Sequence, residues 1–169
     1  TSWYSSDYTK FARTKDTTKK MEGDASLKIT VDKTAPGGSY VYTNKILNSC
    51  GSGTFSISFW IMSSINSPDS AIQFAYSKNQ NLISYSTIPL PALAANTWTY
   101  IVLNINRPTC PDNIKSIGFI YSNNYMATKG GYIYIDEILE ESYGLKVVGK
   151  EIKVRIFDMN PDDSFQICY

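Results

Sequence analysis

The segment 54–64, with the sequence TFSISFWIMSS, constrains most strongly what this chain can fold into. Large apolar side chains occupy every second position, at Phe55, Ile57, Phe59 and Ile61. Because successive side chains of a strand point to opposite faces, this alternation predicts a strand with one buried apolar face. The other face is small and polar except for Trp60 and Met62, so we expect something small, or another chain segment, to lie over it. The pattern predicts a central strand of a sandwich.

Further segments show strand character and are separated by turn residues: 26–31, 39–47, 71–77, 81–86, 98–105, 114–121 and 132–140. Almost no helical period is present, apart from one expected turn over 92–95. These features predict an all-β antiparallel sandwich or barrel. A chain of 169 residues suits one domain. We expect that domain over 1–143, with the N-terminal arm as an irregular segment or edge strand. Residues 144–169 are expected to be a β-hairpin extension or the start of a further domain.

Several function classes are disfavoured by composition. The chain has no His, which removes the common Ser/His/Asp and Cys/His nucleophiles and the usual zinc ligand sets. Its net charge is +1 without a basic run, so we expect no nucleic-acid partner. No apolar run approaches the roughly 20 residues that span a bilayer. Asp136 and Glu137 are adjacent in a predicted strand and point to opposite faces, so they cannot act as an acid/base pair. We expect no enzyme activity and no catalytic residue.

Since the sequence lacks an initiator Met and a signal-peptide pattern, a mature protein or an excised domain is expected.

Five segments in a fixed order resemble a known family: EGDASLKI, FSISFW, NTWTYIVLNI, IKSIGFIY and GGYIYIDEI. Their order and spacing over about residues 20–140 are similar to the galactose-binding-like jelly roll of carbohydrate-binding modules, a fold also found in phage tail and adhesion proteins. The resemblance implies a two-sheet antiparallel jelly roll without a catalytic centre. The N-terminal arm and the segment after Glu140 depart from the family pattern.

The resemblance also implies a structural Ca²⁺ between the turn before the SLKI strand and an acidic residue of the last long strand. Those positions hold Glu22, Gly23 and Asp24 in the turn, and Asp136 in the strand. Calcium takes six to eight oxygen ligands, so backbone carbonyls would complete the set. The alternative is that Glu22 and Asp24 are solvated turn residues.

By the same resemblance, sugar binds on the concave face of one sheet or on loops at the end of the sandwich. Segments 39–47, 71–77 and 98–105 are then expected to share a sheet. The carbohydrate-binding candidates are Tyr40, Tyr42, Gln73, Tyr100 and Asn104 on its outer face, with Tyr85 and Tyr125 reaching in from flanking segments. Aromatic rings stack on the apolar face of a sugar, and amides bind its hydroxyls. The spacing of Tyr100 and Asn104, about 13–14 Å along a strand, suits an extended glycan chain. The alternative is that the tyrosines reflect β-propensity alone, with Val41 and Thr43 facing outward instead.

Three further expectations concern the tryptophans and the cysteines. Trp60 is expected in the core or under a covering segment, and Trp98 as a buried anchor at a bulge. The three cysteines, at 50, 110 and 168, leave at least one thiol free or paired outside the chain. In a jelly roll the loops of Cys50 and Cys110 are expected at opposite ends of the sandwich, which predicts no bond between them.

Two functions remain open. One is a carbohydrate-binding module attached to a secreted, extracellular glycan-degrading protein. The other is a structural or host-adhesion module of a phage virion, in a tail or head appendage. The partners expected are a polysaccharide or cell-surface glycan and the other domains of such an enzyme or virion. The odd thiol count favours the virion, because virions assemble in a reducing cytoplasm.

Overall fold

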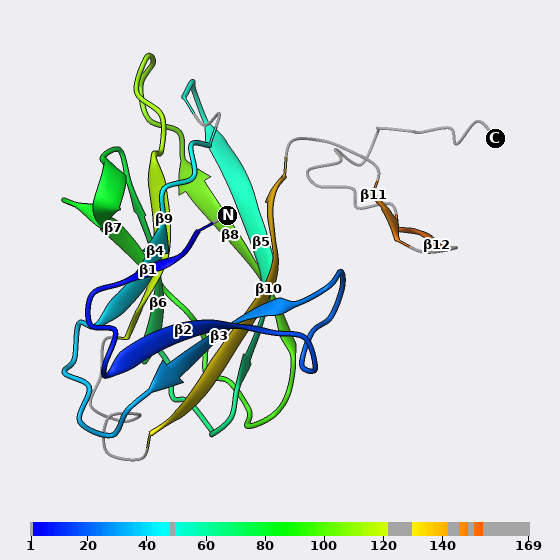
Figure 1. Ribbon diagram of the computed structural model, residues 1–169. Coiled ribbons are helices and arrows are strands. Elements are labelled where there is room, and N and C mark those ends of the chain that lie inside the picture. Colours follow the sequence, from blue (N-terminus) through cyan, green and yellow to red (C-terminus); the bar gives the residue numbers. More distant parts are fainter. Residues whose placement is uncertain (1, 48–49, 122–129, 142–145, 149–150, 154–169) are drawn as a thin grey trace.

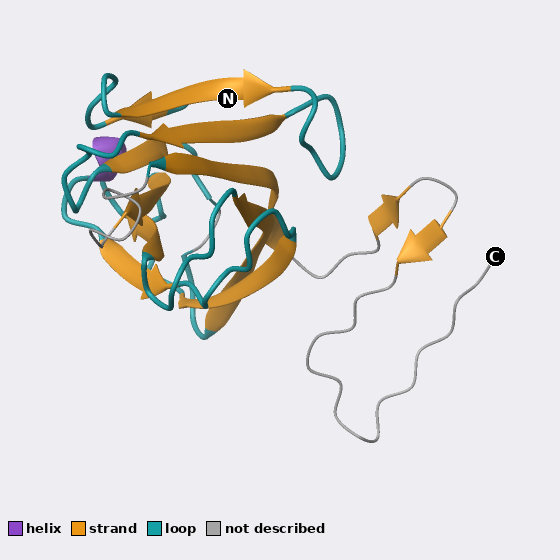
Figure 2. Cartoon of the chain, turned by 90° about the horizontal axis from the view of Figure 1, so that it is seen from below, coloured by secondary structure: helices purple, strands orange, loops and turns teal. Residues whose placement is uncertain are grey.

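The computed structural model describes residues 2–47, 50–121, 130–141, 146–148 and 151–153. Two five-stranded antiparallel sheets face each other and form a β-sandwich (Figures 1 and 2). The helical structure in the described ranges is one 3-10 turn, Gln80–Leu82. The prediction of an all-β jelly-roll sandwich is confirmed. None of the described residues forms a helix long and apolar enough to cross a membrane.

The strand order defines the two layers. One sheet runs in the order β1 (Tyr4–Ser5), β4 (Tyr40–Thr43), β9 (Ser116–Tyr121), β6 (Ile72–Ser77) and β7 (Ser86–Pro89). The other runs in the order β2 (Phe11–Asp16), β3 (Ser26–Val31), β10 (Gly131–Glu141), β5 (Thr54–Ser63) and β8 (Thr99–Asn106). A separate antiparallel pair joins β11 (Lys146–Val148) to β12 (Glu151–Lys153), as the hairpin pattern predicts. The domain limits at 143 and 144 stay a prediction.

The core lies between the two sheets, and β5 supplies its centre. The alternating residues Phe55, Ile57, Phe59 and Ile61 are all buried. Phe59 contacts Phe74 of β6 and Phe119 of β9, with ring centroids 5.7 and 5.1 Å apart. Since β5 pairs with β10 on one side and β8 on the other, the prediction of a central strand is confirmed.

The segment 81–86 was expected to be a strand, and this was wrong. Asn81, Leu82 and Ser84 have left-handed backbone conformations, with φ values of 61°, 53° and 50°. An extended strand cannot contain such residues, so the chain makes a compact loop and β7 begins only at Ser86. The turn expected over 92–95 is not helical; Leu93 and Ala95 make isolated β-bridges instead. The N-terminal arm forms two edge strands, β1 and β2.

The expected sheet position of segment 98–105 was also wrong. Strand β8 does not join β4 and β6 but pairs with β5, from Thr54↔Asn106 to Ile61↔Thr99. The alternation of Ile101, Leu103 and Ile105 shows correctly which face is buried. It carries no information about which strand lies alongside.

This pairing also corrects the prediction about the cysteines. Cys50 and Cys110 form a disulfide, with Cα atoms 4.9 Å apart. Because Thr54 at the start of β5 lies opposite Asn106 at the end of β8, the loops before β5 and after β8 emerge at the same end. Two backbone hydrogen bonds of 2.9 Å join these loops, from Arg107 to Gly53 and from Gly51 to Pro108.

Candidate functional site

The outer face of the sheet β1-β4-β9-β6-β7 carries a cluster of tyrosines. Val41 and Thr43 of β4 are buried, so Tyr40 and Tyr42 point outward, and the predicted strand parity is confirmed. Tyr4 of β1 lies opposite Tyr42, and Tyr85 lies immediately before β7. We call this surface, with Tyr4, Tyr40, Tyr42 and Tyr85, the tyrosine face.

The four rings form a continuous row. The centroids of Tyr4 and Tyr42 are 5.3 Å apart, those of Tyr42 and Tyr40 5.9 Å, and those of Tyr40 and Tyr85 6.4 Å. Neighbouring rings at these separations attract one another, which helps to hold the row in place. Tyr4 and Tyr85 at its two ends are exposed. The row therefore presents several aromatic surfaces in succession to an external ligand.

The loop between β6 and β7, residues 78–85, positions Tyr85 by folding over the middle of this sheet. Leu82 is only 2% exposed and packs with Ala75 and Ile120. Gly118 of β9 makes room for it: a Cβ there would clash with the carbonyl oxygen of Val41 and lie 3.1 Å from Leu82 Cδ2. The glycine at this position thus allows the loop to seat against the sheet.

Polar contacts fix the same loop. The Asn81 amide N–H donates to Asn44 Oδ1 at 2.8 Å, and Asn44 Nδ2 donates to Asn81 Oδ1 at 3.1 Å. The Leu82 N–H donates to the buried Ser116 hydroxyl at 3.1 Å. Gln73 of β6 lies further along the outward parity, opposite Ile120 and Pro89. Side-chain amides of Asn44, which follows β4, of Gln73 on β6 and of Asn81 in the loop therefore lie on the same sheet as the tyrosine row.

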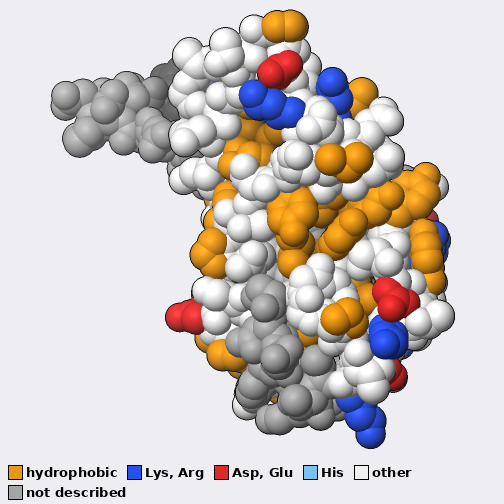
Figure 3. Space-filling view, turned by 90° about the vertical axis from the view of Figure 1, so that its left-hand side faces the viewer, with side chains coloured by type: hydrophobic (Ala, Val, Ile, Leu, Met, Phe, Trp, Pro, Cys, Tyr) orange, Lys and Arg blue, Asp and Glu red, His pale blue; other side chains and the backbone are white. Residues whose placement is uncertain are grey.

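The tyrosine face is nearly free of charge at its centre. Figure 3 looks onto this side of the molecule: hydrophobic side chains, tyrosines included, gather across the middle, and the charged ones lie toward the rim. Burial raises the pKa of Tyr42, and the neighbouring tyrosines add to the shift. A tyrosine hydroxyl is protonated at neutral pH without any shift and can donate a hydrogen bond, and a raised pKa extends this state to higher pH.

The opposite outer face, on β2-β3-β10-β5-β8, holds the remaining predicted strand residues. Tyr100 contacts Trp60 there, with centroids 5.0 Å apart. Asn104 Oδ1 accepts a hydrogen bond of 2.8 Å from the Ser56 hydroxyl. Trp98 lies beside Tyr134 on this face and is half-buried, so its expected burial as an anchor was wrong. Trp60 is also half-buried and lies outside the core.

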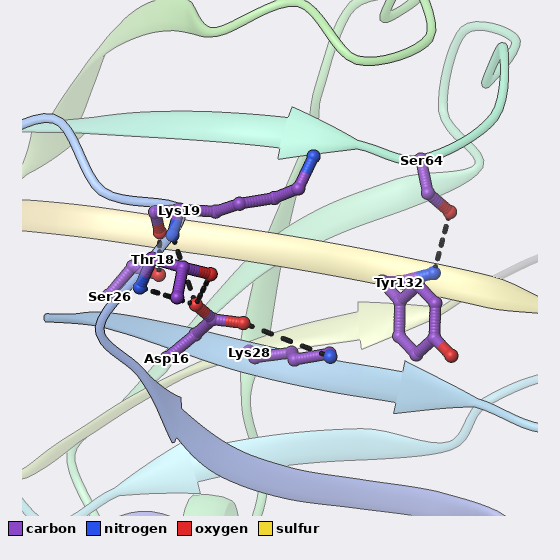
Figure 4. A network of polar contacts seen from close by, with 7 residues as sticks. All are labelled: Asp16, Thr18, Lys19, Ser26, Lys28, Ser64 and Tyr132. Carbon is purple, nitrogen blue, oxygen red and sulfur yellow. Dashed lines mark hydrogen bonds and ion pairs between the residues drawn. The ribbon is translucent and has the colours of Figure 1, made fainter.

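We call this surface the tryptophan face; its rings are Trp60, Trp98, Tyr100, Tyr132 and Tyr134. Lysines lie over part of it. Lys28 Nζ is 4.2 Å from the Tyr132 centroid and 3.8 Å from an Asp16 carboxylate oxygen, and Lys19 Nζ is 5.9 Å from the Tyr134 centroid. Figure 4 shows Asp16, Thr18 and Lys28 in this network. A lysine chain over a ring takes up part of the surface that a neutral ligand would contact. Tyr134 is only 4% exposed, whereas Tyr132 keeps 41% of its surface exposed.

The turn and the strand residue that were expected to hold calcium lie next to each other, but backbone N–H groups contact the carboxylate of Asp136. Asp136 Oδ2 accepts hydrogen bonds from the backbone N–H groups of Met21 and Glu22 at 2.7 and 3.0 Å. Its Oδ1 accepts one from the Glu137 N–H at 2.9 Å. N–H donors pointing at both oxygens do not fit a bound cation, and the described residues contain no cluster of three or more acidic or Cys ligands. Calcium binding at Glu22, Gly23, Asp24 and Asp136 stays a prediction, which melting curves with and without a chelator would test.

The structure thus divides the predicted carbohydrate-binding residues. It brings Tyr40, Tyr42 and Tyr85 into one row, with Gln73 on the same face. Tyr100 and Asn104 lie on the opposite face, and Tyr125 lies outside the described residues. Sequence reasoning missed Tyr4 as a member of the row. Its pairing with β4 is a long-range contact that no local pattern records.

Solved structures similar to this chain include carbohydrate-binding modules. The CBM22-2 xylan-binding domain of Paenibacillus barcinonensis Xyn10C is 16% identical over 82% of this chain and 89% of that domain, with a TM-score of 0.55. The family 11 module of Clostridium thermocellum, in complex with a β-1,3-1,4-mixed-linked tetrasaccharide, is 20% identical over 81% of this chain and 85% of that one, with a TM-score of 0.52. A CBM4 structure is 17% identical over 82% of this chain and 84% of that one, with a TM-score of 0.52.

No family model matches the sequence, and no curated protein matches it. The fold is therefore assigned from the strand order and from the similarity to these structures. It is the jelly-roll β-sandwich found in carbohydrate-binding modules.

Proposed function

We propose that this chain is a non-catalytic carbohydrate-binding module that holds an extended polysaccharide chain on its tyrosine face. The observation that carries the proposal is the row of four tyrosine rings, linked in steps of 5.3 to 6.4 Å. A sugar ring places its apolar face on an aromatic ring and turns its hydroxyls toward amides at the sides. Several rings in succession suit several linked sugars better than a single one.

Two further features support this function. The ligands named for the structural neighbours, xylan and a mixed-linked tetrasaccharide, are themselves chains of sugar units. The chain also has no His, and the carboxylates on β10 fall in two adjacent pairs in sequence, Asp136 with Glu137 and Glu140 with Glu141. Adjacent residues of a strand point to opposite faces and do not form a facing pair. The proposed role is therefore binding without bond cleavage.

Isothermal titration calorimetry with xylan and with mixed-linkage β-1,3-1,4-glucan tests the site. We expect Tyr85→Ala and Tyr4→Ala to weaken binding about three- to tenfold, because each removes a stacking contact of about 0.5–1.5 kcal/mol. Tyr132→Ala is the matched control, since its ring is as exposed but lies on the tryptophan face. Equal losses in the control, or none in the two variants, would move the site away from the tyrosine face.

The disulfide bears on where such a module works. Disulfides persist in oxidising compartments, so the Cys50–Cys110 bond supports an extracellular protein. It also removes part of the argument for a reducing cytoplasm that the three cysteines suggested. If the wild type binds no glycan at all, the structural or host-adhesion role in a virion becomes the better proposal.

A further inference from the structure

The two sheets have four edge strands, and three of them carry features that prevent pairing with another chain. Strand β1 is only two residues long, and β7 has four residues and ends in Pro89. Strand β2, with the sequence FARTKD, carries Arg13, Lys15 and Asp16. Short length, proline and charge are the usual protections of an edge.

Strand β8 has none of these protections. It is eight residues long, and its sequence TYIVLNIN contains no charge, no Pro and no Gly. Within the part of the chain that the structure describes, β8 pairs with β5 alone. Among the described residues, no strand therefore lies on the second side of residues 101–106. The row of N–H and C=O groups at such an edge is a template for another strand.

The side chains of β8 suit a partner strand of the same kind. Val102 is 39% exposed on the outer face, while Ile101 and Leu103 are buried under the inner face directly at the edge. A second strand placed alongside would cover Val102 and extend the apolar layer formed by Ile101 and Leu103. An uncharged strand can pair with its own copy without opposing like charges, whereas β2 would place its charges near their copies.

We propose that β8 is the interface of a homodimer, in which the β8 strands of two copies pair antiparallel. Antiparallel pairing of identical strands is self-complementary, so it forms a closed two-fold contact rather than an open chain. The two five-stranded sheets that contain β8 become one sheet of ten strands. The ladder hydrogen bonds satisfy the open backbone groups on both copies at once.

The two-fold axis of such a pair is perpendicular to the sheet, since only that axis keeps both strands in one sheet. Both copies therefore turn their tyrosine faces to the same side. If the tyrosine face binds glycan as proposed above, the dimer presents two binding sites to one polysaccharide surface. Once the first site is bound, the second binds the same surface at a high effective concentration, so the dimer binds more tightly than the monomer. The pairing itself does not depend on that function.

Sedimentation equilibrium of the full chain over about 10 μM to 1 mM tests the dimer, a range suited to weak interfaces. The wild type is expected to rise from the monomer mass of 18.9 kDa toward twice that value. Val102→Lys should raise the dissociation constant about tenfold or more, because it adds to β8 the charge that protects other edges. Thr14→Lys is the matched control: it adds the same charge to an exposed position of β2, the opposite edge of the same sheet. Thermal melting confirms that both variants are folded.

Three results would overturn the proposal. A wild type that stays monomeric throughout has no such interface. Equal effects of Val102→Lys and Thr14→Lys mean that charge alone, not β8, governs association. A dimer that disappears in Cys168→Ser is a disulfide between chains. Because none of these measurements includes a sugar, their outcome is independent of the proposed glycan site.

Discussion

The two outer faces of the sandwich have much in common, yet they differ in what lies over their rings. Each belongs to a five-stranded sheet, and each carries at least four aromatic side chains. On the tyrosine face the rings contact one another, and amides lie beside them. On the tryptophan face Lys28 and Lys19 lie near the rings of Tyr132 and Tyr134.

This difference distinguishes aromatic residues that stabilise the fold from aromatic residues that can bind a ligand. Strand propensity favours Tyr and Trp on either face, so their presence alone does not indicate a ligand. A lysine chain over a ring stabilises the folded protein and uses the surface that a sugar would need. On the tyrosine face, Tyr40 and Tyr42 pack against the cluster of Ala75, Leu82 and Ile120, while Tyr4 and Tyr85 remain exposed. The pattern of coverage, rather than the number of rings, therefore favours the tyrosine face as the binding site.

The largest effect is expected from removing the disulfide, which joins the loop before β5 to the loop after β8, two strands of the sheet that carries the tryptophan face. The bond closes a separation of 60 residues, and the loop-entropy model gives about 4 kcal/mol for a loop of this length. Cys50→Ser with Cys110→Ser should lower the free energy of unfolding by about that amount, measured by urea denaturation. Glycan affinity of the folded variant should be unchanged, because neither loop contributes to the tyrosine row. A variant as stable as the wild type would show that the bond does not form.

A change at the centre of the tyrosine face comes next. Leu82→Ala should destabilise the fold by about 2–3 kcal/mol, toward the low end for a buried leucine because a loop can partly collapse. Ile83→Ala is the control, since Ile83 is 59% exposed and its loss should cost less than about 0.5 kcal/mol. Leu82→Ala should also weaken glycan binding, because the seat of Leu82 holds Tyr85 beside Tyr40. If Leu82→Ala is less stable but binds glycan as tightly as the wild type, the position of this loop does not matter for the binding site.

Uncovering the tryptophan face is expected to have a smaller effect. Lys28→Ala removes a cation–π contact with Tyr132 and should lower the free energy of unfolding by about 0.5–1 kcal/mol. Lys33→Ala, at an exposed position outside the sheets, should change it by less than about 0.5 kcal/mol. Calorimetry of Lys28→Ala distinguishes the faces directly. New glycan binding in this variant would mean that coverage by lysine had been suppressing a second site.

The smallest effect concerns pH. Backbone N–H groups of Lys19 and Thr18 and the Thr18 hydroxyl donate to Asp16, which lowers its pKa from 3.8 to about 2. A carboxyl with a lowered folded pKa stabilises the protein above its ordinary pKa and loses that contribution as the pH falls toward the folded value. The melting temperature should therefore decrease between about pH 4 and pH 2, and less steeply in Asp16→Asn. Identical pH profiles for the two proteins would show that this turn does not contribute to acid unfolding.

Local pattern identified most of the strands correctly. The predicted limits of β3 are those observed, and β5 differs by one residue at its end. The outward parity of Tyr40 and Tyr42 was also correct, because alternation is a property of the strand itself. Sheet assignment is different: β8 could have paired with β4 or β6 as well as with β5 on the evidence of its own residues. Because β8 pairs with β5, Tyr100 lies on the outer face of the other sheet, and Cys50 lies close enough to Cys110 to form a disulfide.

The loop of residues 78–85 was the other failure, and its cause is also physical. The segment 81–86 has the composition of a short strand, but Leu82 has a φ of 53°, which is unfavourable for a bulky side chain. Contacts distant in sequence compensate: the seat beside Gly118 and the hydrogen bond to Ser116. A conformation stabilised only by the tertiary fold leaves no local signal.

The left-handed residues of this loop also determine how the native protein opens. Asn81, Leu82 and Ser84 would relax on leaving the sheet, so the strain they release offsets part of the apolar contact that is lost. Lifting the loop away is then a subglobal unfolding step of lower free energy than the opening of the core strands. Native-state hydrogen exchange would detect it as early labelling of the Leu82 amide relative to the amides of β5. If the tyrosine face binds glycan as proposed, a glycan stacked on Tyr85 and Tyr40 would bind only the closed form. Saturating ligand would then slow exchange of the loop amides of Asn81 and Leu82 while the core rates stay constant.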